Sequence, residues 1–429
     1  MVVLILATSP ATDEAIPFCN PKGVNLADTA EPVDSERTKT NAGARSKPTY
    51  PALDGLRALA ISLVFIEHFG GGSHGGPILV WFNRLRFFGA SGVSLFFVLS
   101  GFLITGILYD TRNDERYFKN FYARRSLRIF PIFYLVLALC VALTPILHFS
   151  WQWGHLSFLF YLGNFFANRN WSLYVLESPT HPLLSINLAH FWSLFVEEQF
   201  YLIWPVVVFW IRDRKTLIRL SLTVILVVLF LRVGMVWFLP INVAERFAFR
   251  MLPTRADDLL MGGALALLLR DPKGCPWLRR SWVLLIFGFV AFFSIACWRG
   301  NFGFTDPYNL TVGLTLVSIA SAGLIGSSIQ EGTLISRALS TRPLRIIGKY
   351  SYGFYVYHVL FTKALIAYFL WCMALVRSMA IAGLIYSSTC YLATLVVSCL
   401  SYQLFEKRFL AMKSRFQYAT RRTLSEEKS

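Results

Sequence analysis

The sequence is poor in charge. Only 15% of its 429 residues are charged, whereas soluble domains average about 25%, so the chain cannot cover its surface with charged side chains. Hydrophobic residues make up 55% of the sequence and aromatic residues 16%, and the mean hydropathy is +0.52. This composition excludes a soluble enzyme, a disordered protein and a secreted disulfide scaffold. It predicts an all-α, polytopic membrane helix bundle.

Paired cysteines and a basic nucleic-acid module are also missing. The seven cysteines lie mostly in apolar runs without a CxxC spacing, as small core residues do, and they imply neither a metal nor disulfides. The net charge of +17 is spread in short clusters between apolar runs, so we expect no nucleic-acid partner. The basic residues are instead informative about topology.

Long apolar runs dominate the sequence after a polar start. A spanning helix needs about 20 residues, which makes 155–167 too short and 256–270 marginal. We predict a disordered cytoplasmic tail over 1–50, a membrane domain over 51–405 and a basic cytoplasmic tail over 406–429. The predicted spans are 53–71, 87–109, 129–148, 190–211, 217–239, 256–270, 281–298, 309–328, 350–371 and 379–405.

Lys and Arg indicate which loops face the cytoplasm, because cytoplasmic loops are enriched in them. One alternating set of loops holds 25 Lys and Arg and the other set holds eight. This grouping requires an even number of crossings between Arg128 and Arg212, so 155–167 lies at the interface or re-enters. About ten spans result, with both termini in the cytoplasm. The basic set comprises 110–128, 212–219, 270–280, 329–349 and 406–429.

The first span carries an arginine and a histidine eleven residues apart, Arg57 and His68. They fall within about 20° of each other on a helix and about 16 Å apart along its axis. An elongated anionic molecule could follow that face, with its reactive end at the histidine. Alternatively, Arg57 reaches the cytoplasmic headgroups and His68 lies at the outer interface.

Two arginines, Arg125 and Arg128, share a helix face at the cytoplasmic end of another span. Their spacing favours phosphate binding, although cytoplasmic loops carry such charges in any case. A third segment holds adjacent carboxylates, Glu197 and Glu198, in the first half of a span. A helix cannot turn both to one face, so at least one meets the interior, or they pair with a cation such as Arg232.

Acidic residues also open the span at 256–270, where Asp257 and Asp258 follow Arg255. Ion pairing that holds the helix entry and a role in substrate binding are equally compatible with this pattern.

Together these motifs resemble the acyltransferase-3 family of membrane acyltransferases, over nearly the whole chain outside the tails. Each motif is weak alone, but their order and spacing are specific. The matching stretches are Leu53–Arg57 continuing to His68, Phe96–Thr105, Arg125–Pro131, Trp192–Tyr201, Thr254–Asp257 and Tyr350–His358.

The resemblance implies acylation of carbohydrate hydroxyls, with acetyl-CoA or another acyl-CoA entering from the cytoplasm as donor. The acceptor would be a glycan of the cell surface, such as peptidoglycan, lipopolysaccharide or an exopolysaccharide, and the enzyme would be a multi-pass protein of the inner or plasma membrane. The family's Arg-x10-His and Arg-x-x-Arg patterns fall on Arg57 with His68 and on Arg125 with Arg128. Its buried carboxylate segment falls on Glu197 and Glu198.

Acyl transfer to a hydroxyl needs a base, a docked donor and stabilisation of an oxyanion. We expect His68 to be the base, and Arg57, Arg125 and Arg128 to hold the donor. Glu197 or Glu198 would orient the imidazole or position the acceptor. We expect no metal and no permanently bound cofactor.

Two other classes of protein are alternatives to an acyltransferase. A transporter of a small anionic solute or a lipid-linked sugar would also place polar residues at mid-membrane, often within internal repeats, and no repeat is visible here. A receptor or scaffold would explain the glycines of the second span but not Arg57, His68 and Glu197 together. The oligomeric state does not follow from the sequence.

Overall fold

The computed structural model describes residues 50–69, 77–271, 276, 278–376 and 378–417, so the predicted tail over 1–50 lies almost wholly outside it. The described residues are mainly helical and contain one antiparallel ladder of two-residue strands, β1 (Val175–Leu176) and β2 (Ile186–Asn187). The helices are α1 (Pro51–Phe69), α2 (Pro77–Arg86), α3 (Ser91–Thr111), α4 (Tyr117–Leu147), α5 (Gly163–Ala167), α6 (Trp192–Trp210), α7 (Arg214–Phe238), α8 (Ile241–Arg250), α9 (Leu252–Leu268), α10 (Ser281–Arg299), α11 (Leu314–Ser328), α12 (Leu334–Leu339), α13 (Arg342–Lys349), α14 (Ser351–Tyr357), α15 (Thr362–Val376), α16 (Met379–Ser401) and α17 (Lys407–Ala411).

Six helical segments of the described chain are long and apolar enough to cross a membrane, and a bent pair, α14 with α15, could form a seventh. These segments confirm a multi-pass membrane protein with a helical fold. The six segments are Asn83–Thr111, Tyr117–Leu147, Arg214–Phe238, Leu278–Arg299, Asn309–Ser328 and Met379–Arg415.

Three further predicted spans form helices that are too polar or too short for that set. They are α1, α6 and α9, and each contains charged residues that belong to the sequence motifs. Charged side chains within spans face a bundle interior or a cavity, which would let these helices cross as well. The count of about ten spans stays a prediction.

The stretch 155–167 forms two short elements, a 3-10 helix over Trp153–Phe160 and α5. Neither is long enough to cross a bilayer, in agreement with the prediction that this stretch does not cross. The loop that contains it is tied to α15, because the Lys363 ammonium pairs with the Glu177 carboxylate. This hydrogen bond holds the pKa of Glu177 below its usual range.

The predicted span 350–371 is not one helix. It is divided into α14 and α15, which meet at an angle of 84°. The backbone N–H of Asn187 donates to the Leu360 carbonyl over 2.7 Å, so a strand residue takes the place of a helical partner at the break. A broken helix is tolerated at membrane depth where protein surrounds it.

The last helical segment extends beyond the predicted boundary at residue 405. Helical structure continues through Arg415, so the beginning of the predicted tail over 406–429 belongs to the bundle. This end is anchored on α4, where Arg124 donates to the carbonyls of Lys413 and Phe416, both over 3.3 Å. Residues 418–429 lie outside the described chain.

Close helix packing explains the glycines of the second predicted span. A Cβ at Gly101 of α3 would lie 1.8 Å from the Leu259 carbonyl oxygen, and one at Gly262 of α9 would lie 1.9 Å from that of Val98. The two backbones thus approach more closely than larger residues would allow, as small residues permit in membrane helices.

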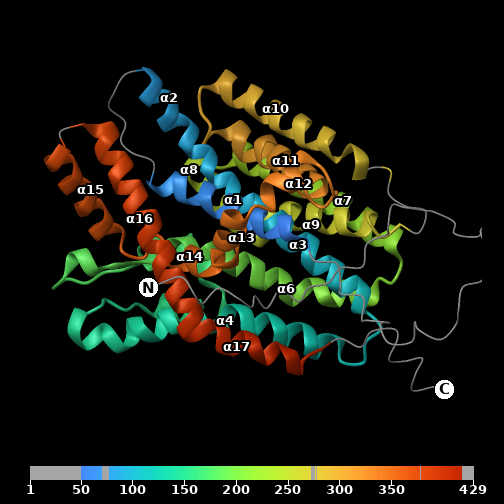
Figure 1. The fold of residues 1–429 in the computed structure, drawn as a ribbon, viewed down its shortest axis with the longest axis horizontal. Coiled ribbons are helices and arrows are strands. Elements are labelled where there is room, and N and C mark those ends of the chain that lie inside the picture. Colours follow the sequence, from blue (N-terminus) through green and yellow to red (C-terminus); the bar gives the residue numbers. More distant parts are fainter. Residues whose placement is uncertain (1–49, 70–76, 272–275, 277, 377, 418–429) are drawn as a thin grey trace, which may run out of the picture.

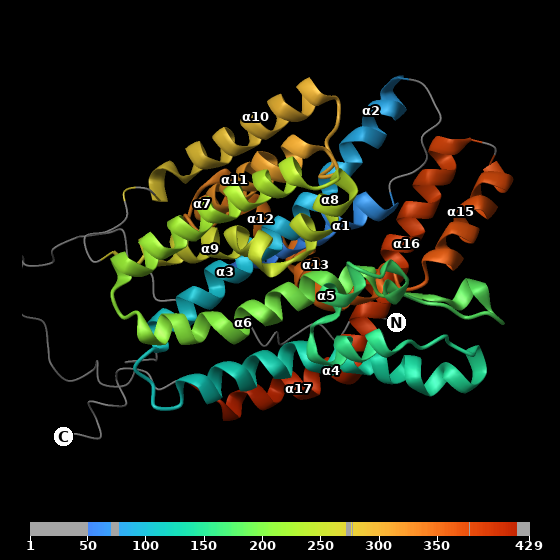
Figure 2. The same cartoon turned by 180° about the vertical axis from the view of Figure 1, so that it is seen from behind.

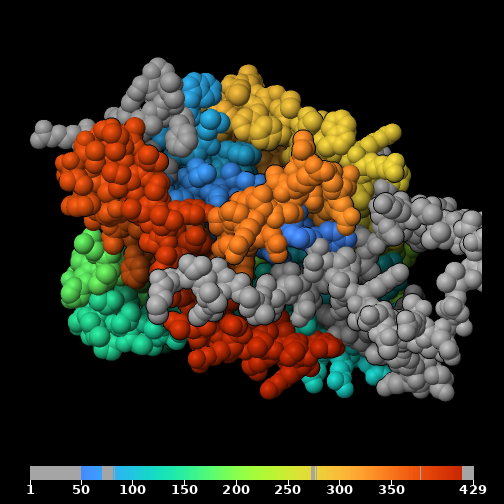
Figure 3. Space-filling model, in the orientation of Figure 1, coloured from blue at the N-terminus to red at the C-terminus, as the bar shows by residue number. Residues whose placement is uncertain are grey.

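The helices lie side by side, with α10 at one edge of the bundle and α4 with α17 at the other (Figures 1 and 2). Helices of the C-terminal third lie in front of α1 on the face shown in Figure 3. We call one end of the bundle the basic end, where α3 and α9 finish and α7 begins. Arg270 pairs there with Asp110 over 2.6 Å, and Arg214 with Asp271 over 3.0 Å.

The basic end is predicted to face the cytoplasm. A topology reporter fused after Asn168 should therefore read as external, and one fused after Arg214 as cytoplasmic. The expectation rests on the surplus of Lys and Arg at the basic end and on the short elements of 155–167. A cytoplasmic signal after Asn168 would contradict this topology.

Candidate active site

A cavity of about 110 Å³ is lined by residues of α1, α3, α4, α6 and α14. Three arginines and one glutamate are among its lining residues, together with hydroxyl-bearing and apolar side chains. The charged members are Arg57, Arg125, Arg128 and Glu197. The structure thus brings together four of the six site residues predicted from sequence, from three different helices.

Arg57 enters the cavity from α1, and its side chain is almost fully buried. Its Nη1 atom donates to the Asp54 carboxylate, one helical turn earlier, over 2.7 Å. A guanidinium has five N–H donors, so this bond leaves Arg57 with donors for a second anion. The alternative in which Arg57 extends to the lipid headgroups is wrong.

Arg125 and Arg128 lie on α4, which begins at Tyr117, so the predicted helix face is present. Arg125 stacks over the Tyr201 ring, with its Cζ 5.9 Å from the ring centre. Both arginines are close enough to Glu197 to interact with it electrostatically. The cavity therefore has a basic wall that faces a carboxylate.

The two adjacent glutamates have different surroundings, as helix geometry requires. Glu197 lines the cavity beside Ser100 and Tyr201, whose hydroxyl groups are hydrogen-bonded to each other over 2.6 Å. Glu198 is not a lining residue, and its Oε1 atom is buried without a hydrogen-bond partner. Glu197 is therefore the carboxylate that can meet a ligand in this cavity.

Two hydroxyl groups, of Ser193 and Tyr355, also line the cavity. The Tyr355 hydroxyl donates to the backbone carbonyl of His190. Because that proton is committed, the 2.5 Å contact between Ser193 Oγ and Tyr355 must be donated by the serine. Neither hydroxyl proton therefore points to a ligand.

His68 is not among the residues that line the cavity, which differs from the expectation that a donor following α1 meets this histidine directly. The His68 ring packs edge-on against His358, with centres 5.1 Å apart, and His358 lies 5.6 Å from the Tyr355 ring. His358 thus lies next to both His68 and the cavity wall. The His68 side chain is itself exposed at the end of α1.

The hydrogen bonds of the histidines define their proton-accepting atoms. His68 Nδ1 is 2.8 Å from the Val64 carbonyl and His358 Nδ1 is 2.7 Å from that of Tyr355. A carbonyl only accepts, so each Nδ1 carries a proton and Nε2 is the free acceptor of the neutral ring. His190 is held the other way, with Nε2 against the Val356 carbonyl.

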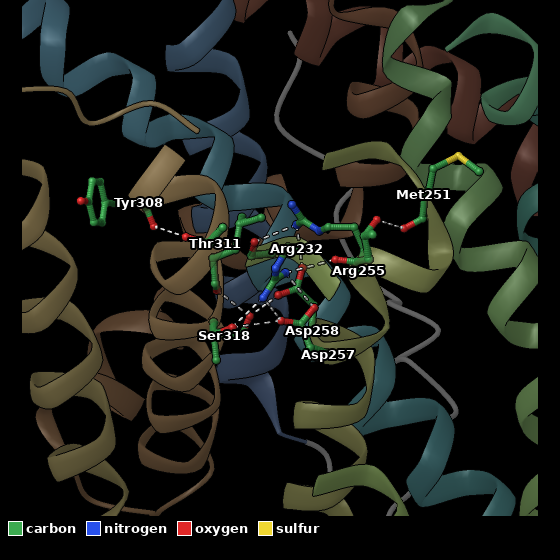
Figure 4. A network of polar contacts seen from close by, with 12 residues as sticks. Arg232, Met251, Arg255, Asp257, Asp258, Tyr308, Thr311 and Ser318 are labelled. Atoms are coloured by element: carbon green, nitrogen blue, oxygen red, sulfur yellow. Dashed lines mark hydrogen bonds and ion pairs between the residues drawn. The ribbon is translucent and has the colours of Figure 1, made fainter. Parts of the chain in front are cut away.

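A separate network of buried ion pairs lies beside the cavity (Figure 4). Arg232 on α7 pairs with Asp257 over 2.6 Å, and Arg255 pairs with Asp258 over 2.6 Å. All four side chains are fully buried, and Ser318 of α11 donates to Asp258. The network joins α7, α9 and α11.

This network answers two alternatives left open by the sequence. Arg232 is paired with Asp257, so the pairing of Arg232 with the glutamates of α6 is wrong. Arg255 also donates to Ser94 of α3 over 2.9 Å and contacts the rings of three aromatic residues, including the cavity residue Phe97. Ion pairing therefore accounts for the acidic opening of α9, between α7 and α9 for Asp257 and within α9 for Asp258.

Sequence reasoning gave no role to several residues that the structure places at the site. Ser100, Ser193, Tyr352 and Tyr355 line the cavity, and His190 and His358 stand behind it. Uncharged hydroxyl groups are common in membrane helices, so they gave no signal. Of these residues, His358 could have been found from the sequence, because it is a second histidine at the end of a span.

The arrangement can hold an elongated anion with its charge at Arg57, Arg125 and Arg128 and its other end near Tyr355. Among the described residues, no group of three or more His, Cys, Asp or Glu side chains could hold a metal ion.

Comparison with known proteins identifies the family. Residues 50–403 match a family described as an acyltransferase domain, the acyltransferase-3 family. The chain is 31% identical over 329 residues to the peptidoglycan O-acetyltransferase OatA of Listeria monocytogenes, covering 73% of this chain and 49% of that protein. It is 28% identical over 328 residues to the O-acetyltransferase OatA of Staphylococcus aureus, covering 72% and 50%.

The chain spans about half the length of these curated relatives. No solved structure matches it. The family match extends over more than four fifths of the chain and includes the helices that enclose the cavity, which confirms the predicted resemblance: the chain belongs to the acyltransferase-3 family.

Proposed function

We propose that this protein transfers an acyl group, in the first instance acetyl, from acyl-CoA to a hydroxyl of a cell-envelope glycan. The cavity lined by three arginines within an acyltransferase domain is the observation that carries the proposal. The name of one relative favours peptidoglycan as acceptor. The long apolar helices favour a membrane location, which we propose is the inner or plasma membrane.

Arg125, Arg128 and Arg57 bind the anionic part of the donor, which enters from the basic end. Charge-assisted bonds from arginine to phosphate are among the strongest in proteins. The thioester lies at the end of the donor's long flexible arm and advances along the cavity past Tyr355. Glu197 keeps the arginine side chains in position before the donor arrives.

His68 acts as general base through Nε2. It removes the proton of the acceptor hydroxyl as the oxygen attacks the thioester carbonyl carbon, and a tetrahedral oxyanion forms. Collapse of this intermediate breaks the carbon–sulfur bond and releases the CoA thiolate, which takes the proton back from the imidazolium. His358 supports the His68 ring from behind.

Measurement of acyl transfer by the purified protein tests this function directly. The protein in detergent is given radiolabelled acetyl-CoA and soluble fragments of peptidoglycan, and acetylated product is measured against free CoA. Uptake of an anionic solute or a lipid-linked sugar into proteoliposomes, without acyl transfer, would favour the transporter alternative.

The donor site makes a specific prediction about Arg125 and Arg128. Replacement of either by Ala should weaken acyl-CoA binding about ten- to hundredfold, because a charge-assisted hydrogen bond contributes roughly 1.5–3 kcal/mol. Isothermal titration of the purified variants with acetyl-CoA measures the loss. Arg57→Ala should weaken binding by a similar factor.

Arg124→Ala is the matched control. Arg124 is adjacent to Arg125 on α4, but it donates to backbone carbonyls near the C-terminal end and does not line the cavity. It should keep wild-type affinity, with thermal melting used to verify folding. Equal affinities in all four variants would contradict a donor role for these arginines.

The catalytic step makes a different prediction about His68. His68→Ala should bind acetyl-CoA normally and lose glycan acylation by about 10²–10⁴-fold, because a general base contributes rate rather than affinity. Initial rates at saturating donor, together with titration of the same sample, separate the two effects.

His181→Ala serves as the control for His68, since His181 is an exposed histidine of the loop that precedes α6. This variant should transfer at the wild-type rate. If His68→Ala also does, the base is another group, and Glu197 becomes the first alternative to test.

A further inference from the structure

An aromatic and basic surface lies at the end of the bundle opposite the basic end. Trp171 begins the short 3-10 turn Trp171–Tyr174 and is 41% exposed. Two arginines of α8, one helical turn apart, extend over its ring. The Cζ atoms of Arg246 and Arg250 lie 6.0 and 4.9 Å from the ring centre.

The Arg250 side chain has an incomplete set of hydrogen bonds. Its Nη2 atom is 3.4 Å from the Glu245 carboxylate, a long contact for an ion pair, and its Nη1 atom is buried without a hydrogen-bond partner. A buried donor without an acceptor is costly. The Arg250 side chain is 15% exposed, so its accessible part suits an oxygen-bearing anion that approaches from the surface.

This surface adjoins the residue that we propose as base. Arg250 is close enough to Glu67 to interact with it electrostatically, and Glu67 precedes His68 in α1. Arg86 also donates to the Glu67 carbonyl over 3.2 Å. A ligand held by Arg250 would thus lie toward the end of α1 that carries His68.

Polar groups next to Trp171 are of the kind that recognise sugar hydroxyls. Asn170, Gln152 and Ser172 are exposed and form a hydrogen-bonded cluster, in which Ser172 donates to Asn170 over 2.8 Å and Asn170 to Gln152 over 3.2 Å. Amides both donate and accept, as sugar hydroxyls do. An exposed indole adds an apolar surface for the C–H groups of a sugar ring.

We propose that this surface, comprising Trp171, Arg246, Arg250 and the Asn170 cluster, binds the acceptor and selects a glycan that carries a carboxylate. The carboxylate binds Arg250 and Arg246, and the sugar ring packs at Trp171. The inference rests on the proposed function and adds the acceptor's charge to it. Arginine and tryptophan also suit lipid headgroups at a membrane surface, but the exposed amide cluster favours the glycan.

The test uses a matched pair of acceptors. One is a soluble peptidoglycan disaccharide with its lactyl carboxylate, and the other is the same disaccharide with the carboxylate reduced to an alcohol. For wild type, KM should be about ten- to hundredfold lower for the carboxylate form. Arg250→Gln should raise KM for this form by the same factor, and leave KM for the alcohol form and kcat unchanged.

Two other variants complete the test. Trp171→Ala should raise KM for both acceptors, because stacking does not depend on charge. Arg299→Gln is the control: Arg299 lies at the same end and stacks on Trp298 at 5.5 Å, but it is paired with Asp306 over 3.0 Å. It should behave as wild type.

Equal KM values for the two disaccharides in wild type, or an equal effect of Arg250→Gln on both, would overturn the proposal. So would an effect of Arg250→Gln that occurs only in nanodiscs of anionic lipid, which would assign the surface to lipid. Direct titration of the disaccharides into the protein without donor separates this inference from the proposed function. Weaker binding by Arg250→Gln without any acyl transfer would support the surface and reject the transfer.

Discussion

The cost of placing charge in an apolar interior determines how this bundle is organised. An unpaired buried charge is strongly destabilising, so buried charges occur in pairs or face a cavity. The pairs of Arg232 with Asp257 and of Arg255 with Asp258 meet this requirement completely. The cavity also gathers charge, because three arginines and one glutamate are among its lining residues, and Arg57 is paired there with Asp54. One cluster therefore joins helices, and the other suits an anionic ligand.

This difference explains which parts of the site the sequence could predict. A charge within an apolar run is visible without a structure, and spacing places Arg125 and Arg128 on one face of a helix. Both fall on the cavity wall with Arg57. The family pattern adds His68, whose role stays a prediction. Pairing between helices depends on tertiary contacts, so the partner of Arg232 could not be found by spacing. The choice between Glu197 and Glu198 depends on which side of α6 meets the cavity.

Apolar runs predicted most helix positions for a similar reason, since the run must match the membrane thickness. They failed where a contact distant in sequence decides the backbone. The break between α14 and α15 is supported by a hydrogen bond from Asn187 to Leu360, and no local signal near residue 360 reports it. The extension of the last helix through Arg415 depends on Arg124 of α4. The first difference affects the site, because the break places His358 against His68.

His358, at the break between α14 and α15, lies between the cavity residue Tyr355 and His68. His68 is at the end of the bundle opposite the basic end. His68 and His358 each donate Nδ1–H to a carbonyl of their own chain segment, which leaves Nε2 as the acceptor in each neutral ring. The hydroxyl protons of Ser193 and Tyr355 are committed to Tyr355 and to the His190 carbonyl, so neither is available to a bound ligand. In the proposed mechanism the proton of the acceptor therefore goes to an imidazole. His68 is exposed, whereas Glu197 is only partly exposed and lines the cavity, so the proposed base is the more accessible of the two groups.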